Sequence, residues 1–192
     1  MPIFKHTKNT RPILENSPKY IRSDVPTVIT DGEKDWLLSN GVTTVIDLRT
    51  EKERERKHCP LMDDARFSYY FFPLTGGDAV PESPDRVAAS YIAMVDVTFR
   101  GLMALLLTAK TGVLYFCNAG KDRTGVVSAA LLYKLGIPHD AIVADYMVSK
   151  ANLQEALNEF ASKNPSVDIK IITPQARYIE DFLAWYQANG NE

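Results

Sequence analysis

Residues 117–125 read Cys-Asn-Ala-Gly-Lys-Asp-Arg-Thr-Gly. The apolar run Gly-Val-Leu-Tyr-Phe occupies positions 112–116 just before it, and a helical apolar pattern follows from Thr124 to Leu135. The segment is therefore predicted to form a strand, a tight loop and a helix, with the loop at the helix N-terminus. A helix N-terminus carries unpaired N–H groups and about half a positive charge. We therefore expect this loop to bind an anion.

The residues of the loop suit the hydrolysis of a phosphate ester. Gly120 allows the backbone to approach a ligand closely or to adopt a positive φ, and the planar fork of Arg123 matches two phosphate oxygens. Cys117 lies in the same positive field, which favours its nucleophilic thiolate form. Thr124 is placed to donate its hydroxyl to the sulfur. Successive N–H groups form an anion-binding nest, so the predicted phosphate-binding residues are Asn118, Ala119, Gly120, Lys121, Asp122 and Arg123.

The Cys-x5-Arg-Thr spacing resembles the signature of the cysteine-dependent protein tyrosine phosphatase superfamily. The longer string Ala-Gly-Lys-Asp-Arg-Thr-Gly is similar to the bacterial atypical or lipid-type branch, and residues 20–23, 41–49 and 144–149 resemble its recurring segments in the same order. The resemblance spans roughly residues 10–190. It implies a phosphoric monoester hydrolase of the protein-tyrosine-phosphatase type that forms phosphocysteine. Phosphotyrosine in proteins is the favoured substrate, and phosphoserine, phosphothreonine and phosphoinositides stay open.

Phe116 departs from that family, which usually has a histidine before the cysteine to orient the loop and hold the thiolate. This departure keeps a second interpretation open, a pseudophosphatase that binds phosphorylated ligands with little turnover. The intact Cys117, Asp122 and Arg123 argue against it. Sulfur transfer and arsenate reduction also use a cysteine in an anion loop. However, sulfurtransferase loops lack the Arg-Thr-Gly ending, and arsenate reduction needs paired resolving cysteines, for which only Cys59 is available.

The general acid that protonates the leaving oxygen has three candidates. Asp122 ranks first, because it lies inside the loop and is the suggested acid in related families with the same string. Asp47 ranks second, because it ends a neighbouring predicted strand. We slightly favour a structural role for Asp47, in which its carboxylate bridges to Arg49 or to the loop. Asp78 ranks third, in a loop rich in glycine and proline where classical phosphatases keep a mobile acid.

Several other residues have two interpretations each. Lys121 either attracts a second phosphate, as in related phosphatases with phosphoinositide substrates, or is a solvated surface lysine. Arg49 either braces the loop or carries a surface charge. Cys59 either forms a protective disulfide with Cys117 under oxidation or, as we favour, is a plain buried cysteine. The charged cluster 51–57 is expected to be a solvated helix face.

The composition is typical of a single globular domain and gives no sign of nucleic-acid binding, a membrane span or a metal site. The chain has 192 residues, of which 45% are hydrophobic, a net charge of −2 and a pI of about 6.0. These values predict one globular domain over residues 1–192 and give no electrostatic footprint for nucleic acid. The longest apolar stretch, 102–107, is too short to span a bilayer, and no secretory signal opens the chain. Two separated cysteines and scattered histidines predict no metal site. We expect no cofactor, because the loop itself supplies positive charge. We expect the protein to be located in the reducing cytoplasm, and leaderless export stays open.

The order of predicted elements favours an α/β fold. Strands are expected at 19–23, 42–48, 67–72 and 113–117. Helices are expected after capping boxes at Thr30 and Thr50, from Pro84 to about Ala109, from the loop to Gly136, after Pro138 and after Thr173. Residues 1–19 are expected to form an extended arm, and Asp145 and Tyr146 to support packing. Such alternation implies a mostly parallel central sheet with helices on both faces, as in tyrosine phosphatases. Ligands of such sheets bind beyond the carboxyl ends of the strands, where Asp47 and Cys117 are both predicted.

Overall fold

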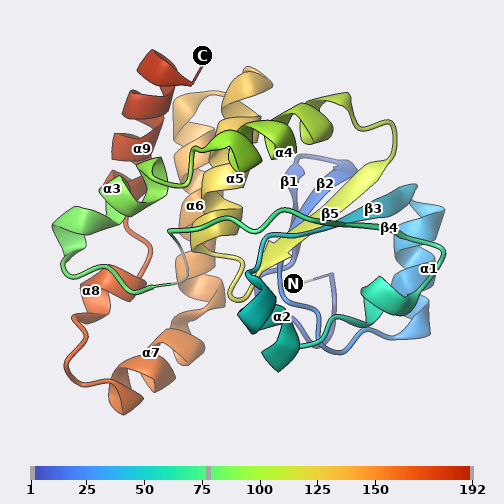
Figure 1. The fold of residues 1–192 in the computed structure, drawn as a ribbon, viewed down its shortest axis with the longest axis horizontal. Helices are drawn as coiled ribbons and strands as arrows, with labels where there is room; N and C mark the ends of the chain where they lie inside the picture. The colour runs from blue at the N-terminus through green and yellow to red at the C-terminus, as the bar shows by residue number, and fades with distance from the viewer. Residues whose placement is uncertain (1–2, 77–78, 191–192) are drawn as a thin grey trace.

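A computed structural model of the chain describes residues 3–76 and 79–190, in which a central sheet lies between helices (Figure 1). The five strands are β1 (Arg11–Leu14), β2 (Ser17–Asp24), β3 (Val42–Asp47), β4 (Ser68–Phe71) and β5 (Gly112–Cys117). Their order across the sheet is β1-β2-β5-β3-β4. β1 pairs with β2 in antiparallel orientation, and all other pairs are parallel. The predicted mostly parallel α/β fold is confirmed.

The helices follow the strands in the expected alternation. They are α1 (Asp31–Ser39), α2 (Glu51–Arg56), α3 (Val87–Ile92), α4 (Val97–Thr108), α5 (Asp122–Lys134), α6 (His139–Asn152), α7 (Gln154–Lys163), α8 (Ile169–Ile172) and α9 (Ala176–Asn189). Two short 3-10 helices add Pro60–Asp63 and Pro84–Arg86. Figure 1 shows α5, α6 and α9 gathered on one side of the sheet and α1 on the other.

The central strand β5 supplies both hydrophobic cores. All six of its residues are buried. Val113, Tyr115 and Cys117 join the larger core with residues of α3, α4, α5, α6 and α9. Leu114 and Phe116 join the smaller core with Leu37 of α1. Because successive strand residues point to opposite faces, Cys117 and Phe116 necessarily serve different cores.

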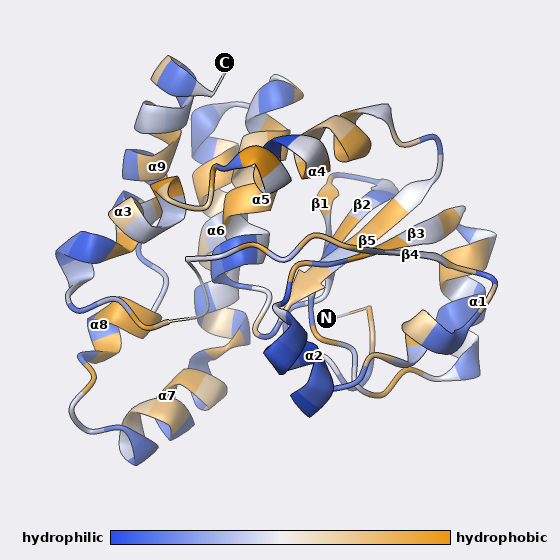
Figure 2. Cartoon of the chain, in the orientation of Figure 1, coloured by the Kyte–Doolittle hydropathy of each residue, from blue (hydrophilic) through white to orange (hydrophobic). Residues whose placement is uncertain are grey.

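Both predicted capping boxes form. Thr30 caps α1 and exchanges hydrogen bonds with Glu33, and Thr50 stands in the same relation to Glu53 at the start of α2. Figure 2 shows α2 as hydrophilic along its length, in agreement with its Glu-Lys-Glu-Arg-Glu-Arg sequence. Because α2 directly follows β3, its first turn is held beside the carboxyl ends of β3 and β5.

Two expectations about the fold are wrong. The extended arm expected over residues 1–19 contains β1 (11–14), which pairs with β2 in a hairpin at the sheet edge, whereas the strand expected at 19–23 is confirmed as part of β2. The single helix expected from Pro84 to Ala109 is broken, and its two parts differ in direction by 68°. The break arises because the Asp96 carboxylate accepts a hydrogen bond from the Phe99 N–H (2.9 Å) and thereby caps a new helix. The helices α7 and α8 were not expected from the sequence.

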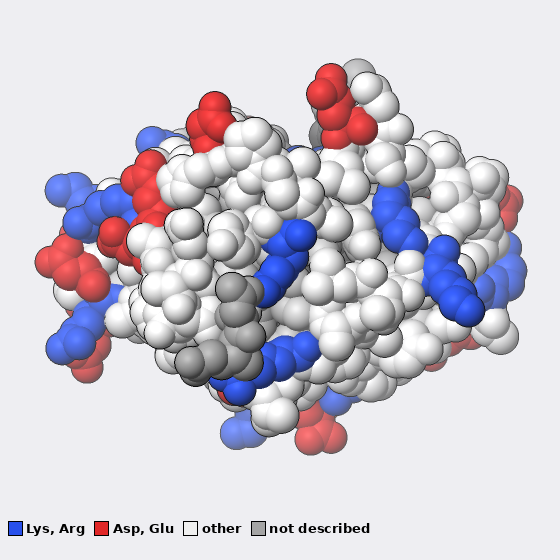
Figure 3. Space-filling view, turned by 90° about the horizontal axis from the view of Figure 1, so that it is seen from above, with Lys and Arg blue, Asp and Glu red and all other residues white. Residues whose placement is uncertain are grey.

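The surface carries charges of both signs. On the face shown in Figure 3, uncharged residues predominate and the basic side chains lie scattered between them. In the described ranges, no helix by itself has the length and apolar character needed to cross a membrane. The bent pair Pro84–Ile92 and Val97–Thr108 reaches that threshold only when both parts are taken together.

Candidate active site

Cys117 ends β5, and the chain then turns through the loop 118–121 into α5. The side chain is buried, with the residue 3% exposed. Gly120 sits in this loop with φ +63°, and a Cβ at this position would lie 2.4 Å from the Ser23 carbonyl oxygen. Only glycine fits this conformation and this contact. The predicted order of strand, tight loop and helix is confirmed.

The loop turns its carbonyl groups away from the site. The Asn118 carbonyl accepts from the Val25 N–H (3.2 Å), and the Gly120 carbonyl accepts from the side chains of Asn9 (2.7 Å) and Arg22 (2.8 Å). In a planar trans peptide the N–H points opposite to the carbonyl. The N–H groups that follow these carbonyls therefore face the other way, as an anion-binding nest requires.

A buried ionic cluster supports the loop from beneath. Arg22 is fully buried and pairs with Asp145 of α6 (2.5 Å), which also pairs with Arg11 of β1 (2.9 Å). Ser149 of α6 accepts from the Asn9 amide (3.1 Å). The segments 20–23 and 144–149 thus meet under Gly120. Asp145, expected to support packing, does so through charge.

Arg123 is held by a carboxylate from another element. Its two terminal nitrogens donate to the two oxygens of Glu53 in α2, both at 2.6 Å. Asn118 also donates to Glu53 (2.5 Å), as does the backbone of Thr50 (2.8 Å). Burial opposes ionisation of Glu53, but the hydrogen bonds from Arg123 and Thr50 outweigh it and lower the pKa to about 2. The Nε of Arg123 is buried and has no partner among the described residues, so its N–H is a donor that remains for a ligand.

Asp122 begins α5 beside the loop. Its Oδ1 accepts from Lys121 Nζ (2.9 Å) and from the hydroxyl of Tyr91 in α3 (2.6 Å). Lys121 is 7% exposed, so it is not a solvated surface lysine. The three side chains line a cavity of about 110 Å³, which the apolar residues Ala79, Val80, Pro81, Val87, Ile171 and Ile172 help to enclose.

Asp47 lies at the carboxyl end of β3 as predicted, but it is engaged elsewhere. Its carboxylate accepts from Arg49 Nε (2.9 Å), from the terminal nitrogen of Arg49 (2.7 Å) and from the Tyr69 hydroxyl (3.0 Å). Arg49 is buried, which excludes its interpretation as a surface charge, and it lies over the ring of Phe116 at 5.3 Å. The geometry therefore favours the bridging interpretation of Asp47 over that of an acid.

The remaining candidates are placed as follows. The Thr124 hydroxyl is buried and makes no hydrogen bond within the described part of the chain, so the expected contact with the sulfur of Cys117 is not formed. Cys59 is an unpaired cysteine in the smaller core, whereas Cys117 belongs to the larger one. Burial raises the pKa of the Cys59 thiol to about 11, which makes it a poor partner for oxidation. Asp78 lies outside the described residues.

Comparison with known proteins agrees with this geometry. The sequence model of the tyrosine phosphatase family matches residues 8–189. The chain belongs to the tyrosine phosphatase family. The match includes β1, the loop and α9, and so covers every element that contributes to the site.

Individual relatives are distant members of this family. A tyrosine-protein phosphatase of Nostoc commune is 32% identical over 136 residues, which are 66% of this chain and 46% of that protein. A protein of Cupriavidus necator named for the same activity is 28% identical over 181 residues, 83% of this chain and 65% of its own. This chain therefore spans about half to two thirds of these relatives. The solved catalytic core of Siw14 shares the fold, with a TM-score of 0.52 at 14% identity over 82% of this chain and 92% of that one.

Sequence reasoning missed four residues that shape the site. Glu53 is not part of a solvated helix face, since its carboxylate holds Arg123. Asn9 and Arg22 support Gly120, and Tyr91 contacts Asp122. A signal existed only for Glu53, because it follows the β3 strand end by one helical turn and must lie at the same sheet edge as Cys117.

Substituting Gly120 with alanine is expected to destabilise the protein by at least about 2 kcal/mol, because it adds a clash to an unfavourable backbone conformation. Gly136→Ala is the matched control, since Gly136 has φ +76° but open space around its Cβ position. Chemical unfolding of both variants separates the two effects. Equal losses in both variants would show that the contact with Ser23 costs nothing.

Glu53→Gln is expected to lower stability near neutral pH and to matter less in acid. The folded state lowers the pKa of Glu53 from 4.5 to about 2, so ionised Glu53 stabilises the fold above about pH 4.5, and this contribution is lost as the pH falls toward about 2. The difference in unfolding free energy between wild type and variant should shrink over that range. Exposed Glu155→Gln serves as the control. A difference that does not depend on pH would contradict the ion pair with Arg123.

Proposed function

We propose that this chain hydrolyses phosphomonoesters, most readily phosphotyrosine in proteins, through a phosphocysteine intermediate on Cys117. The observation that carries the proposal is the arrangement around the loop. A thiol ends the central strand, N–H groups follow it at the N-terminus of α5, and Arg123 is fixed by Glu53. Membership of the tyrosine phosphatase family supports the same reaction.

The phosphate binds in the nest formed by residues 118–123. Its oxygens accept hydrogen bonds from the loop N–H groups and from Arg123, whose Nε is directed by the clamp of Glu53 on the other two nitrogens. The positive end of α5 adds to the attraction. Donors held in advance of the reaction stabilise the charge that develops on the phosphoryl oxygens.

The reaction proceeds in two displacements. The Cys117 thiolate attacks phosphorus, the P–S bond forms, and the ester P–O bond breaks while Asp122 donates a proton to the leaving oxygen. Water then attacks phosphorus, Asp122 takes a proton from that water, and the P–S bond breaks to restore the thiolate and release phosphate. Asp122 returns to its protonated form, so each turnover balances.

The depth of the thiol supports phosphotyrosine as the preferred substrate. Cys117 is only 3% exposed, so the phosphate must reach inward, and a phenyl ring provides more length than serine or threonine. The cavity beside Asp122 has apolar walls suited to a ring. Lys121 borders the same cavity and would interact with a second phosphate group if inositol phosphates bound.

A protein that binds phosphate without turnover is the second candidate function. Phe116 is the observation that favours it, because its ring packs in the smaller core below Arg49 and has no polar atom with which to orient the loop. In this case phosphopeptides would bind to the loop and persist unhydrolysed.

The test is phosphate release from phosphotyrosine, phosphoserine and phosphothreonine peptides and from phosphoinositides, with reductant and without added metal. We expect release to be fastest from phosphotyrosine, and acid quenching during turnover to trap phosphate on the peptide that contains Cys117. Release without phosphocysteine would refute the mechanism. Binding of a phosphotyrosine peptide without release, with activity gained on Phe116→His, would establish the second candidate.

A further inference from the structure

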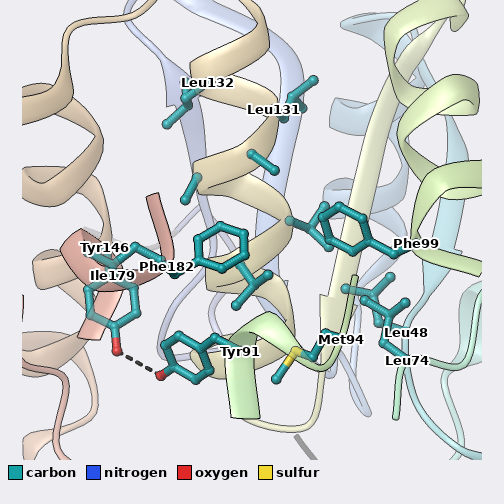
Figure 4. Close-up of a cluster of buried hydrophobic side chains, with 14 of the residues drawn as sticks. Leu48, Leu74, Tyr91, Met94, Phe99, Leu131, Leu132, Tyr146, Ile179 and Phe182 are labelled. Carbon is teal, nitrogen blue, oxygen red and sulfur yellow. Dashed lines mark hydrogen bonds between the residues drawn. The ribbon is translucent and has the colours of Figure 1, made fainter. Parts of the chain in front are cut away.

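Two buried tyrosines meet behind Asp122. Tyr91 of α3 and Tyr146 of α6 are each 1% exposed, and their hydroxyl oxygens are 2.8 Å apart. Figure 4 shows these hydroxyls directed at each other at one side of the cluster of buried side chains. The Tyr91 hydroxyl also lies 2.6 Å from Asp122 Oδ1. Three groups from three helices thus form one hydrogen-bonded chain.

The donors and acceptors fix the direction of the hydrogen bonds from Tyr146 through Tyr91 to Asp122. A carboxylate only accepts hydrogen bonds, and a phenol has a single O–H. Tyr91 must therefore donate to Asp122, and Tyr146 must donate to Tyr91. Lys121 Nζ donates to the same Oδ1. Since Oδ1 accepts from two groups, a proton that Asp122 carries for the reaction belongs on Oδ2. The chain keeps its direction whether or not that proton is present.

Packing holds the two rings in place. They make an edge-to-face contact with centroids 6.3 Å apart. Tyr146 lies against α5 at Gly125, where a Cβ would come within 3.1 Å of its ring. Tyr91 precedes the break between α3 and α4, which lets α3 approach α5 from its own direction. The glycine that ends the 117–125 string thus makes room for the tyrosine that completes the chain.

Burial keeps both phenols protonated. It raises the pKa of Tyr91 and of Tyr146, and the charge of Asp122 raises both further. The tyrosines are therefore constant donors rather than acids that take part in turnover.

We propose that Tyr91, supported by Tyr146, is a positioning residue that orients Asp122 so that its Oδ2 delivers a proton to the leaving oxygen. This inference rests on the proposed function. A poor leaving group needs the proton in the transition state, whereas a good one departs nearly unaided. Loss of the Tyr91 hydroxyl should therefore affect the two classes of substrate unequally. A merely structural role would affect both alike.

The experiment compares wild type with Tyr91→Phe on phenyl phosphate and on p-nitrophenyl phosphate, which has the better leaving group. We expect kcat/KM, which contains only the steps up to departure of the leaving group, to fall about 10-fold or more on phenyl phosphate and less than about 2-fold on p-nitrophenyl phosphate. Tyr146→Phe, which leaves the Tyr91–Asp122 bond intact, should show the same selectivity with a smaller loss. Tyr133→Phe is the control for loss of a phenol on α5 and should leave both rates unchanged.

A second measurement keeps the inference testable if Tyr91→Phe is less stable. In an Asp122→Asn background, Tyr91→Phe should cause no further loss on phenyl phosphate, because the group it orients is gone. An equal loss on both substrates, or an additive loss in the double variant, would overturn the positioning role while leaving the proposed function intact. Absence of release by wild type from both substrates would overturn the two together.

Discussion

Cys117→Ser is expected to reduce phosphate release at least about 1,000-fold on every substrate, because a serine hydroxyl, unlike the cysteine thiol, does not form a stable anion near neutral pH. The loop itself should be unchanged, since serine and cysteine have similar shapes and Gly120, Arg22 and Asn9 fix the backbone independently. Phosphotyrosine peptide binding should therefore persist. Steady-state release and binding by calorimetry measure the two properties separately.

Cys59→Ser is the matched control for this substitution. Cys59 is the other cysteine of the chain and is similarly buried, but it lies in the smaller core. Its substitution should leave phosphate release within about 3-fold of wild type once stability is accounted for. Activity retained in Cys117→Ser, or lost equally in both variants, would be incompatible with a phosphocysteine intermediate on Cys117.

Arg123→Lys should reduce kcat/KM by about 100- to 1,000-fold, the range found when one donor to a developing oxyanion is removed. Arginine can bond Glu53 with two nitrogens and still present a third to the phosphate, whereas lysine is a single point charge. The lysine variant keeps the positive charge but cannot bond Glu53 and the phosphate at the same time with separate nitrogens. We expect kcat to account for most of the loss, because the charge that still attracts the substrate remains.

Arg66→Lys tests whether the effect is specific to the site. Arg66 also donates from two of its nitrogens to a carboxylate, that of Asp64, but Arg66 lies on the exposed surface. This variant should retain full activity, because exposed ion pairs contribute little. A loss in Arg123→Lys confined to KM would mean that Arg123 only binds substrate and does not stabilise the transition state.

Local pattern was sufficient for much of the fold. The capping boxes at Thr30 and Thr50 and the helix after the loop form where expected, and the strands expected at 42–48 and 113–117 form at 42–47 and 112–117. Each depends on interactions between residues within about one helical turn or on alternation along one strand. Pattern failed at Asp96, where one carboxylate ended a long apolar helix and began another.

The contact between Glu53 and Arg123 could not be predicted from local sequence pattern. Glu53 has a complete local role in its capping box, and its position after β3 indicates only the sheet edge at which it lies, not that it binds Arg123. Its contact with Arg123 joins residues 70 positions apart. Burial of Arg22 was equally hidden, because an arginine in a strand is usually exposed and only the partners Asp145 and Gly120 make its burial tolerable.

The sequence by itself determined the loop, its nucleophile and its arginine, because Cys117, Gly120 and Arg123 lie within seven consecutive residues whose geometry is set by one strand end and one helix start. Tertiary structure decided which carboxylates contact the site and which stabilise the fold. Asp47 pairs with Arg49, Glu53 pairs with Arg123, and Asp122 accepts a hydrogen bond from Tyr91. A buried charge must find a partner wherever the packing places one, and that partner is a property of the assembled cores rather than of any stretch of chain.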